Sequence, residues 1–305
     1  MGLPAGDGFF PIVVPTAPRF SVSFPSHQAP PSPEELESLV KLLDDETPEV
    51  RQGIAARLAQ FGGDVSEWLA ERNVRLTGRE RGLLSAMLGA ARRAELEREW
   101  LAPSGGAEAM GEDWEGFEAM LRLISDFLHD GVSIRQPLSD ALDLLAEEAA
   151  EREVMSAEEL RVFLFVQERL KANGDDGDDP RNLDLAWAIA TGQSNPLGLG
   201  LVFMLVGRRL GFEVEAVDFP GHFLCRIYRE GFPIVIDCHD HGRQHLQSTL
   251  LESPDLDRGE RAVLRQAAHP GRVMRRLLDE LESDLEDADR GEDAALIRRL
   301  RKTLG

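Results

Sequence analysis

PGHFLCRIYREGFPIVIDC, which occupies residues 220–238, decides the fold at the centre of this chain. Apolar, aromatic and β-branched residues fill two runs, and such runs favour strands at residues 222–229 and 233–238. The Glu-Gly pair between the runs is typical of a two-residue hairpin turn. The stretch therefore predicts an antiparallel hairpin, and a similar run predicts a further strand before it, at residues 213–218.

The predicted register brings a histidine and an aspartate onto one face of the hairpin. A two-residue turn places Asp237 opposite Leu224, and His222 shares a face with Leu224 because strand side chains alternate. His222 and Asp237 are then diagonal neighbours, roughly 7–8 Å apart at the backbone. An aspartate bonded to one imidazole nitrogen fixes the tautomer and leaves the other nitrogen free to act as a base. This His222–Asp237 dyad is the candidate catalytic pair.

Helical patterns surround the hairpin. The most informative pattern begins at Asn195-Pro196, a cap followed by a proline, and ends at Gly211. It is apolar almost all round, which predicts a central buried helix. Further helical patterns cover residues 79–100, 114–129, 138–151, 156–172, 182–191, 260–267, 271–287 and 292–304. The sequence therefore predicts an α+β fold, predominantly helical, with a small antiparallel sheet packed on a central helix.

The amino-terminal part has a different character. Residues 1–33 are dense in proline, which blocks helices and central strands, so we expect an extended arm. Ser32 and Thr47, each followed by a proline, are expected to cap the first two helices of a helical region over residues 34–101. Glycines and a proline at residues 102–116 indicate a loop or linker.

The composition excludes several classes of partner. The chain has 305 residues, 42% of them hydrophobic, which suffices for a sizeable core. A net charge of −21 argues against nucleic acid or an anionic membrane, because phosphate attraction requires clustered Lys and Arg. No apolar run approaches the roughly 20 residues of a membrane span, and we see no signal peptide. The two cysteines, Cys225 and Cys238, imply no disulfide framework, so a cytoplasmic protein is expected.

The central motifs resemble a known family. In chain order they are G-x-x-N-P-L from Gly192, R-R-L-G at residues 208–211, P-G-H-F-L at residues 220–224, I-D at residues 236–237, and Gly242. This order resembles the SirB-type branch of the transglutaminase-like superfamily, over about residues 115–305. The resemblance implies a transglutaminase-like, papain-like core, in which His222 and Asp237 match two members of a Cys-His-Asp triad.

The same resemblance reveals a missing nucleophile. Active members of the superfamily carry a cysteine at the start of the central helix. Counted back from Gly211, that position holds Pro196, with Leu197 next, and neither side chain can attack a carbonyl. Ser194, just before the helix, is a weak stand-in. The two cysteines are expected to point away from the dyad because strand side chains alternate.

The flanking regions carry weaker resemblances. DDETPEVR at residues 44–51 resembles the turn of a single HEAT-type helical repeat, and residues 272–304 resemble the family's tetratricopeptide-like tail. The expected organisation is a proline-rich arm at residues 1–33, a HEAT-like region at residues 34–101, a SirB-type transglutaminase-like domain at residues 114–258, and a helical hairpin at residues 259–305.

Three histidines follow the hairpin. His239, His241 and His245 belong to a residue type that binds zinc, and in a loop past the strand they would converge on His222. Their spacing matches no standard zinc module, and a polar loop over the dyad explains them as well. No other cofactor is indicated.

Two functions of different classes fit these observations. The leading expectation is a non-catalytic binding or regulatory module, with a small ligand in the cleft at His222 and Asp237 and a protein partner on the helical flanks. The alternative is a hydrolase or peptidase in which His222 activates water, with or without a metal. In a third reading the dyad is a structural remnant that only stabilises the hairpin.

Overall fold

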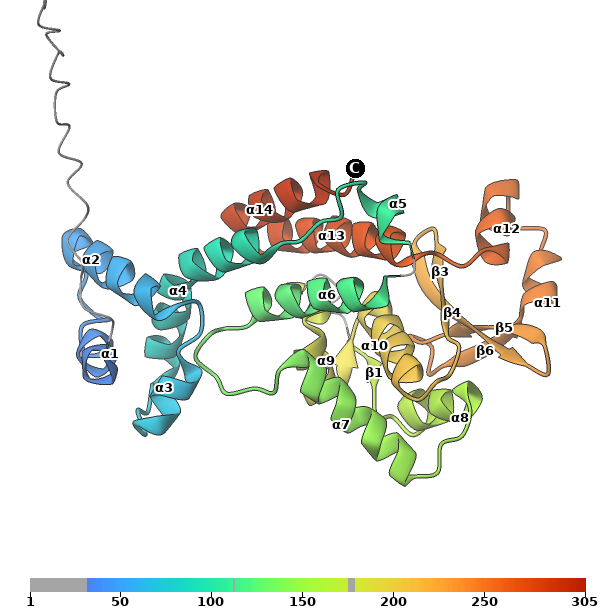
Figure 1. Ribbon diagram of the computed structural model, residues 1–305, viewed down its shortest axis with the longest axis horizontal. Coiled ribbons are helices and arrows are strands. Elements are labelled where there is room, and N and C mark those ends of the chain that lie inside the picture. Colours follow the sequence, from blue (N-terminus) through green and yellow to red (C-terminus); the bar gives the residue numbers. More distant parts are fainter. Residues whose placement is uncertain (1–31, 112, 175–178) are drawn as a thin grey trace, which may run out of the picture. The chain divides into compact units, whose positions relative to one another are not determined.

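The helices nearest the amino terminus pack around an apolar cluster that Val132, from a later loop, also joins. The computed structural model describes residues 32–111, 113–174 and 179–305, so the arm predicted at residues 1–33 lies outside it apart from its last two residues. Figure 1 shows the first helices, which are α1 (Pro33–Val40), α2 (Pro48–Leu58), α3 (Ser66–Glu71) and α4 (Gly78–Glu99).

The caps of these helices follow the sequence signals. Ser32 Oγ accepts a hydrogen bond from the backbone N–H of Glu35, which satisfies one of the free amides in the first turn of α1. Thr47 occupies the N-cap position of α2 in an extended conformation, as predicted. A reciprocal capping box between Thr77 and Glu80 starts α4.

A second group of helices forms the middle of the chain. It consists of α5 (Ala107–Met110), α6 (Trp114–Leu128), α7 (Leu138–Glu151), α8 (Ala157–Arg161), a π-helical segment (Val162–Val166), a 3-10 segment (Pro180–Leu183), α9 (Leu185–Thr191) and α10 (Pro196–Arg209). None of the helices in the described part of the chain combines the length and the apolar character that crossing a membrane requires.

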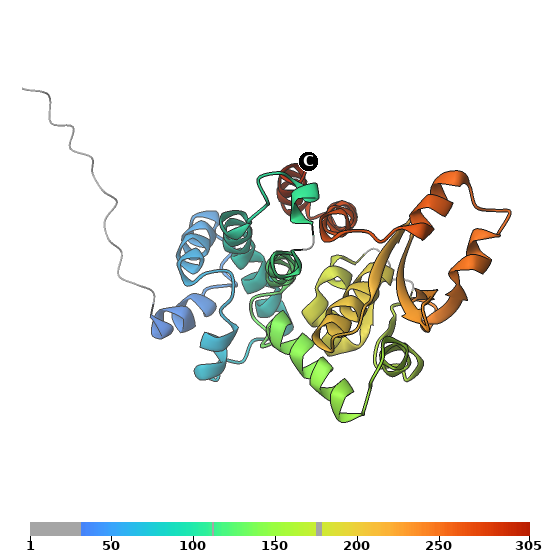
Figure 2. The same ribbon diagram turned by 45° about the vertical axis from the view of Figure 1, so that its right-hand side comes forward.

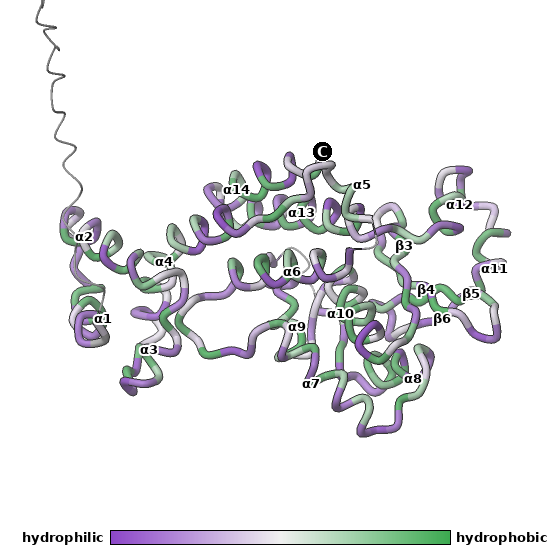
Figure 3. Tube along the Cα trace, in the orientation of Figure 1, coloured by the Kyte–Doolittle hydropathy of each residue, from purple (hydrophilic) through white to green (hydrophobic). Residues whose placement is uncertain are grey.

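α10 is the central buried helix that the sequence predicts. Every residue from Leu197 to Gly207 is buried, and Figure 3 shows the hydrophobic residues that run through this helix. Asn195 caps its start, because its Oδ1 accepts a hydrogen bond from the N–H of Gly198 at 2.8 Å. Beyond its end, Gly211 adopts a φ of 76°, the left-handed conformation that stops a helix.

The main sheet is an antiparallel meander in the order β3-β4-β5-β6. Its strands are β3 (Glu215–Phe219), β4 (His222–Arg229), β5 (Phe232–Asp237) and β6 (Arg243–Leu246). α10 packs on the face that carries Phe223, Cys225 and Ile227, all of which are buried in the main core. The other face contributes Leu224 to a smaller apolar cluster with α12 (Arg258–Arg265), beside α11 (Gln247–Leu251). A separate parallel pair joins β1 (Lys171–Ala172) to β2 (Gln193–Ser194).

The last two helices form a hairpin. α13 (Pro270–Asp287) and α14 (Gly291–Lys302) run side by side in the views of Figures 1 and 2. Buried leucines of both helices belong to the same apolar cluster as α6, α7 and α10. Near the chain end, the Leu304 carbonyl accepts a hydrogen bond from the N–H of Ala107 at 2.8 Å, which ties the hairpin to α5.

The fold class is confirmed, but three segments differ from expectation. The helix predicted at residues 156–172 ends at Val166, because Glu168 takes a positive φ of 56° and the chain turns into β1. The loop predicted at residues 239–245 contains the start of β6, a mostly polar edge strand formed by pairing with β5. The loop predicted at residues 102–116 contains the short helix α5, which packs on α13.

Candidate functional site

The hairpin register that the sequence predicts is confirmed. Arg229 pairs with Phe232 across the tight turn, and Cys225 pairs with Ile236 further along. The turn residue Glu230 adopts a φ of 52° and Gly231 follows at 82°, which is the pattern of a type I′ hairpin turn. Because this turn fixes the register, it also decides which side chains of the two strands meet.

The register brings the predicted dyad together at the end of β4 and β5. His222 Nε2 lies 2.9 Å from Asp237 Oδ2. The imidazole is 35% exposed and the carboxylate 18% exposed, so solvent reaches the ring while its partner is largely covered. With Nε2 turned toward the carboxylate, the chemistry that remains available to the imidazole resides at Nδ1.

Asp237 is held as a carboxylate by its surroundings. Its Oδ1 accepts hydrogen bonds from the backbone N–H groups of His239 and Asp240, at 3.0 and 3.1 Å. Burial by itself raises the pKa of Asp237, but the hydrogen bonds from His222 and from these amides outweigh it and lower the pKa below its ordinary value. The carboxylate is therefore charged at neutral pH and orients the ring of His222.

The first turn of α10 presents no nucleophile at the position where the resemblance places one. Pro196 opens the helix and Leu197 is completely buried. Beside them, Asn195 Nδ2 donates a hydrogen bond to Glu280 Oε1 of α13 at 2.7 Å. Burial raises the pKa of Glu280, against a smaller lowering by the charge of Arg276.

Neither cysteine is placed to replace the missing nucleophile. Cys225 lies on the α10 side of β4, with its Sγ 3.7 Å from the carbonyl oxygen of Gly200, whereas His222 lies on the alternate side. Cys238 is 1% exposed, and burial raises the pKa of its thiol well above the ordinary value, with a further contribution from Cys225. A thiol with a raised pKa is a poor nucleophile because the thiolate is the reactive form.

Ser194 belongs to a different set of contacts. It is completely buried in β2, and its Oγ donates a hydrogen bond to the carbonyl oxygen of Asn182 at 2.5 Å. The structure therefore joins His222 to Asp237 and joins Ser194 to the 3-10 segment before α9.

The three candidate zinc ligands are spread over the turn and over β6. The ring centroid of His239 lies 6.5 Å from that of His222. His241 is exposed in the turn, and His245 lies within β6 opposite Val235. Across residues 32–111, 113–174 and 179–305, no three His, Cys, Asp or Glu side chains are grouped as a metal site would require. The zinc hypothesis stays a prediction.

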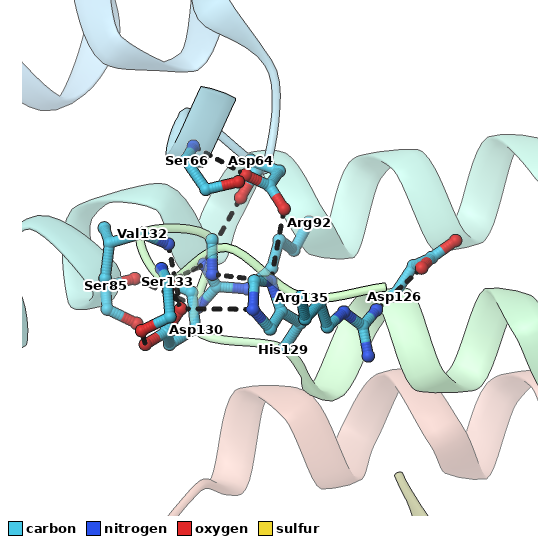
Figure 4. A network of polar contacts seen from close by, with 12 residues as sticks. Asp64, Ser66, Ser85, Arg92, Asp126, His129, Asp130, Val132, Ser133 and Arg135 are labelled. Atoms are coloured by element: carbon cyan, nitrogen blue, oxygen red, sulfur yellow. Dashed lines mark hydrogen bonds and ion pairs between the residues drawn. The ribbon is translucent and has the colours of Figure 1, made fainter. Parts of the chain in front are cut away.

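A polar network that the sequence reasoning missed joins the amino-terminal helices to the α6–α7 loop (Figure 4). His129 Nδ1 lies 3.1 Å from Asp64 Oδ2, and its Nε2 lies 3.4 Å from Asp130 Oδ1. The imidazole is only 9% exposed. Burial raises the pKa of Asp64, but hydrogen bonds from His129 and Ser66 outweigh it and lower the pKa to about 2.

Arg92 of α4 completes this network. One of its terminal nitrogens donates to the carbonyl oxygens of Asp130 and Gly63, and the other donates to that of Ser85 at 3.0 Å. These residues are isolated polar positions far apart in the sequence, so hardly any local pattern identifies them. The one local signal was His129 followed by aspartate and glycine at the end of a helical pattern.

Comparisons with known proteins agree with this arrangement. Residues 134–279 match the family model of the transglutaminase-like superfamily. Two curated relatives, both named UPF0162 protein and from two strains of Xylella fastidiosa, are each 32% identical to this chain over 142 residues. The match covers 44% of this chain and 50% of each relative, so the chain spans about half the length of the curated relatives it matches. No solved structure matches at a significant level.

The matched segment contains α10, the four-stranded sheet and both residues of the dyad. The match therefore covers the antiparallel sheet and the central helix on which it packs, in agreement with the predicted transglutaminase-like core. Residues 134–279 form a transglutaminase-like domain.

Proposed function

We propose that this domain is a non-catalytic binding module, a pseudoenzyme of the SirB-type branch. The observation that carries the proposal is the His222–Asp237 contact, which lacks a neighbouring nucleophile. Pro196 and Leu197 open α10, and both cysteines are buried in contacts with other residues. Covalent acyl transfer requires an activated thiol or hydroxyl beside the histidine. A partly exposed imidazole oriented by a carboxylate is suited to hydrogen-bonding a polar ligand instead.

The flanking helices supply the second part of the proposal. We assign the HEAT-like pair α1–α2 and the tetratricopeptide-like hairpin α13–α14 a role in holding a protein partner, because helical repeat pairs present continuous side-chain surfaces. Two free, buried thiols fit a reducing compartment such as the cytoplasm.

Acyl transfer is tested directly on the full chain. We expect no incorporation of a fluorescent amine into a glutamine-containing peptide, and no mass increase of the intact protein with activated acyl esters. The matched variants are His222→Ala and Asp237→Asn, which should behave like the wild type in both assays. An acyl adduct mapped to Ser194, Cys225 or Cys238 would end the pseudoenzyme proposal.

Binding is tested with the same variants. A library of short peptides and amides, screened by fluorescence anisotropy, should contain ligands whose affinity falls about tenfold in His222→Ala, because the variant loses the hydrogen bond from the imidazole. Ligands that bind the wild type and His222→Ala equally well would show that the dyad is not the binding group.

A hydrolase that activates water is the second candidate, favoured by the 2.9 Å contact between His222 and Asp237. His222 would act as the general base. Turnover of a peptide or ester that disappears in His222→Ala, with a rate that rises as the imidazole deprotonates, supports this candidate. Metal analysis of the purified protein accompanies this assay. Bound zinc that disappears when His239, His241 or His245 is mutated would identify the group that activates the water.

A further inference from the structure

A cavity separate from the dyad lies between α7, α9 and the α6–α7 loop. Its volume is about 540 Å³, within the range of small-molecule pockets. The residues that line it include neither His222 nor Asp237, so this cavity is a different place from the site of the proposed function.

Apolar side chains form half of the residues that line the cavity. α7 contributes Leu144 and Leu145, and α9 contributes Trp187 and Ile189. Ile134, from the α6–α7 loop, is 68% exposed, and Leu144 is 47% exposed. Large aliphatic side chains left in water at the rim of a hollow mark a surface that gains free energy when an apolar molecule covers it.

Polar contacts hold part of the lining in place. Arg135 donates to Asp184 at 2.9 Å and to Asp126 at 2.7 Å, and Asp184 is only 4% exposed. Next to it, His129 and Asp130 belong to the network of Figure 4. The cavity is therefore formed before any ligand arrives, which lowers the entropic cost of binding.

The charged groups of the lining already have partners within the protein. Arg169 pairs with Glu148 at 3.1 Å, and Arg181 pairs with Asp179 while stacking over the ring of Trp187. Arg135 has its two carboxylates, as described above. A charged ligand would compete with these ion pairs for their partners, whereas an uncharged one would leave them intact.

From these observations we propose that the cavity binds an uncharged, predominantly apolar small molecule. The aliphatic walls and the indole of Trp187 receive the apolar body, and the exposed loop residue Gln136 offers hydrogen bonds to a neutral polar end. The exclusion of charge is the specific part of the proposal, because it separates this cavity from a general apolar surface.

The test uses the full chain and N-phenyl-1-naphthylamine, a neutral probe that fluoresces in apolar surroundings. We expect saturable binding to one site. Leu144→Asp places a carboxylate in the wall, and Ala190→Trp, from an exposed position in α9, fills the mouth. Each should weaken probe binding at least about tenfold. The matched control is Leu101→Asp, since Leu101 is 82% exposed and lies outside the lining, and it should bind the probe like the wild type.

Competition distinguishes the chemical class. 1-Octanol should displace the probe, while octanoate of the same chain length should need at least about tenfold more. Thermal unfolding of each variant checks that the fold is kept, and the competition on wild-type protein stands whether or not a variant folds. Probe binding unchanged in both variants, or displacement by octanoate at equal or lower concentration than octanol, would overturn the proposal.

Discussion

Gly131 is the residue whose replacement most sharply tests the packing of the α6–α7 loop. It adopts a φ of 70°, and a Cβ added there would lie 2.3 Å from the carbonyl oxygen of Gly63 and 2.9 Å from a terminal nitrogen of Arg92. Its own carbonyl accepts a hydrogen bond from the N–H of Val65 at 2.8 Å. Gly131→Ala therefore strains the backbone and pushes two backbone segments apart.

The magnitude follows from three contributions to the free energy of unfolding. The left-handed conformation costs a residue with a Cβ roughly 1–2 kcal/mol, and the reduced entropy of the unfolded chain returns about 0.4–1 kcal/mol. Overpacking against a fixed backbone oxygen costs about 1–3 kcal/mol more. We therefore expect Gly131→Ala to lose about 3 kcal/mol of stability.

The matched control is Gly211→Ala. Gly211 has a similar φ of 76° but nothing within 4 Å of an added Cβ, so it reports the backbone strain alone, about 1 kcal/mol. Urea unfolding followed by tryptophan fluorescence gives both values. If the two variants lose the same stability, the α6–α7 loop does not approach Gly63 as closely as the network requires.

Three further perturbations have definite outcomes. Asp64 has a folded pKa of about 2 against 3.8 in the unfolded chain, so the unfolded chain binds its proton first as the pH falls, and the stabilisation present above about pH 4 is lost toward pH 2. The difference corresponds to about 2 kcal/mol, which solvent screening reduces to roughly 1 kcal/mol because the side chain is 51% exposed. The gap in urea midpoint between wild type and Asp64→Asn should close over this pH range. Cys225 and Cys238 should resist alkylation in the folded protein and react fully in urea, counted by intact mass, and rapid native labelling of either thiol would contradict their burial. Arg135→Met should lose about 3–5 kcal/mol by leaving the buried carboxylate of Asp184 without its counter-ion, and a loss below about 1 kcal/mol in urea unfolding would show that the pair is not structural.

The strongest predictions from the sequence are those in which one short stretch contains the whole physical cause. The two-residue turn at Glu230 and Gly231 sets the hairpin register, and strand alternation then places His222 and Asp237 on one face. The sequence predicts α10 equally well, because a cap, a proline and an unbroken apolar run lie in one segment. The sequence does not predict the short strand β6, because a polar edge strand is stabilised only by hydrogen bonds to the backbone of its partner strand.

The sequence does not predict the polar contacts of the site outside the hairpin. The contact between Asn195 and Glu280 and the contact between His129 and Asp64 each join side chains that are distant along the chain. No periodicity of the sequence identifies such pairs, since each member by itself is an ordinary polar residue.

The amino-acid sequence by itself determined the hairpin, its register and the central helix, because local backbone preferences and side-chain alternation act over a few residues. It also shows directly that no cysteine stands at the start of that helix. Only the tertiary structure decided which polar groups are buried together and where a cavity remains. Those outcomes depend on how whole helices pack, since burial and ion pairing are properties of surfaces that meet from separate parts of the chain.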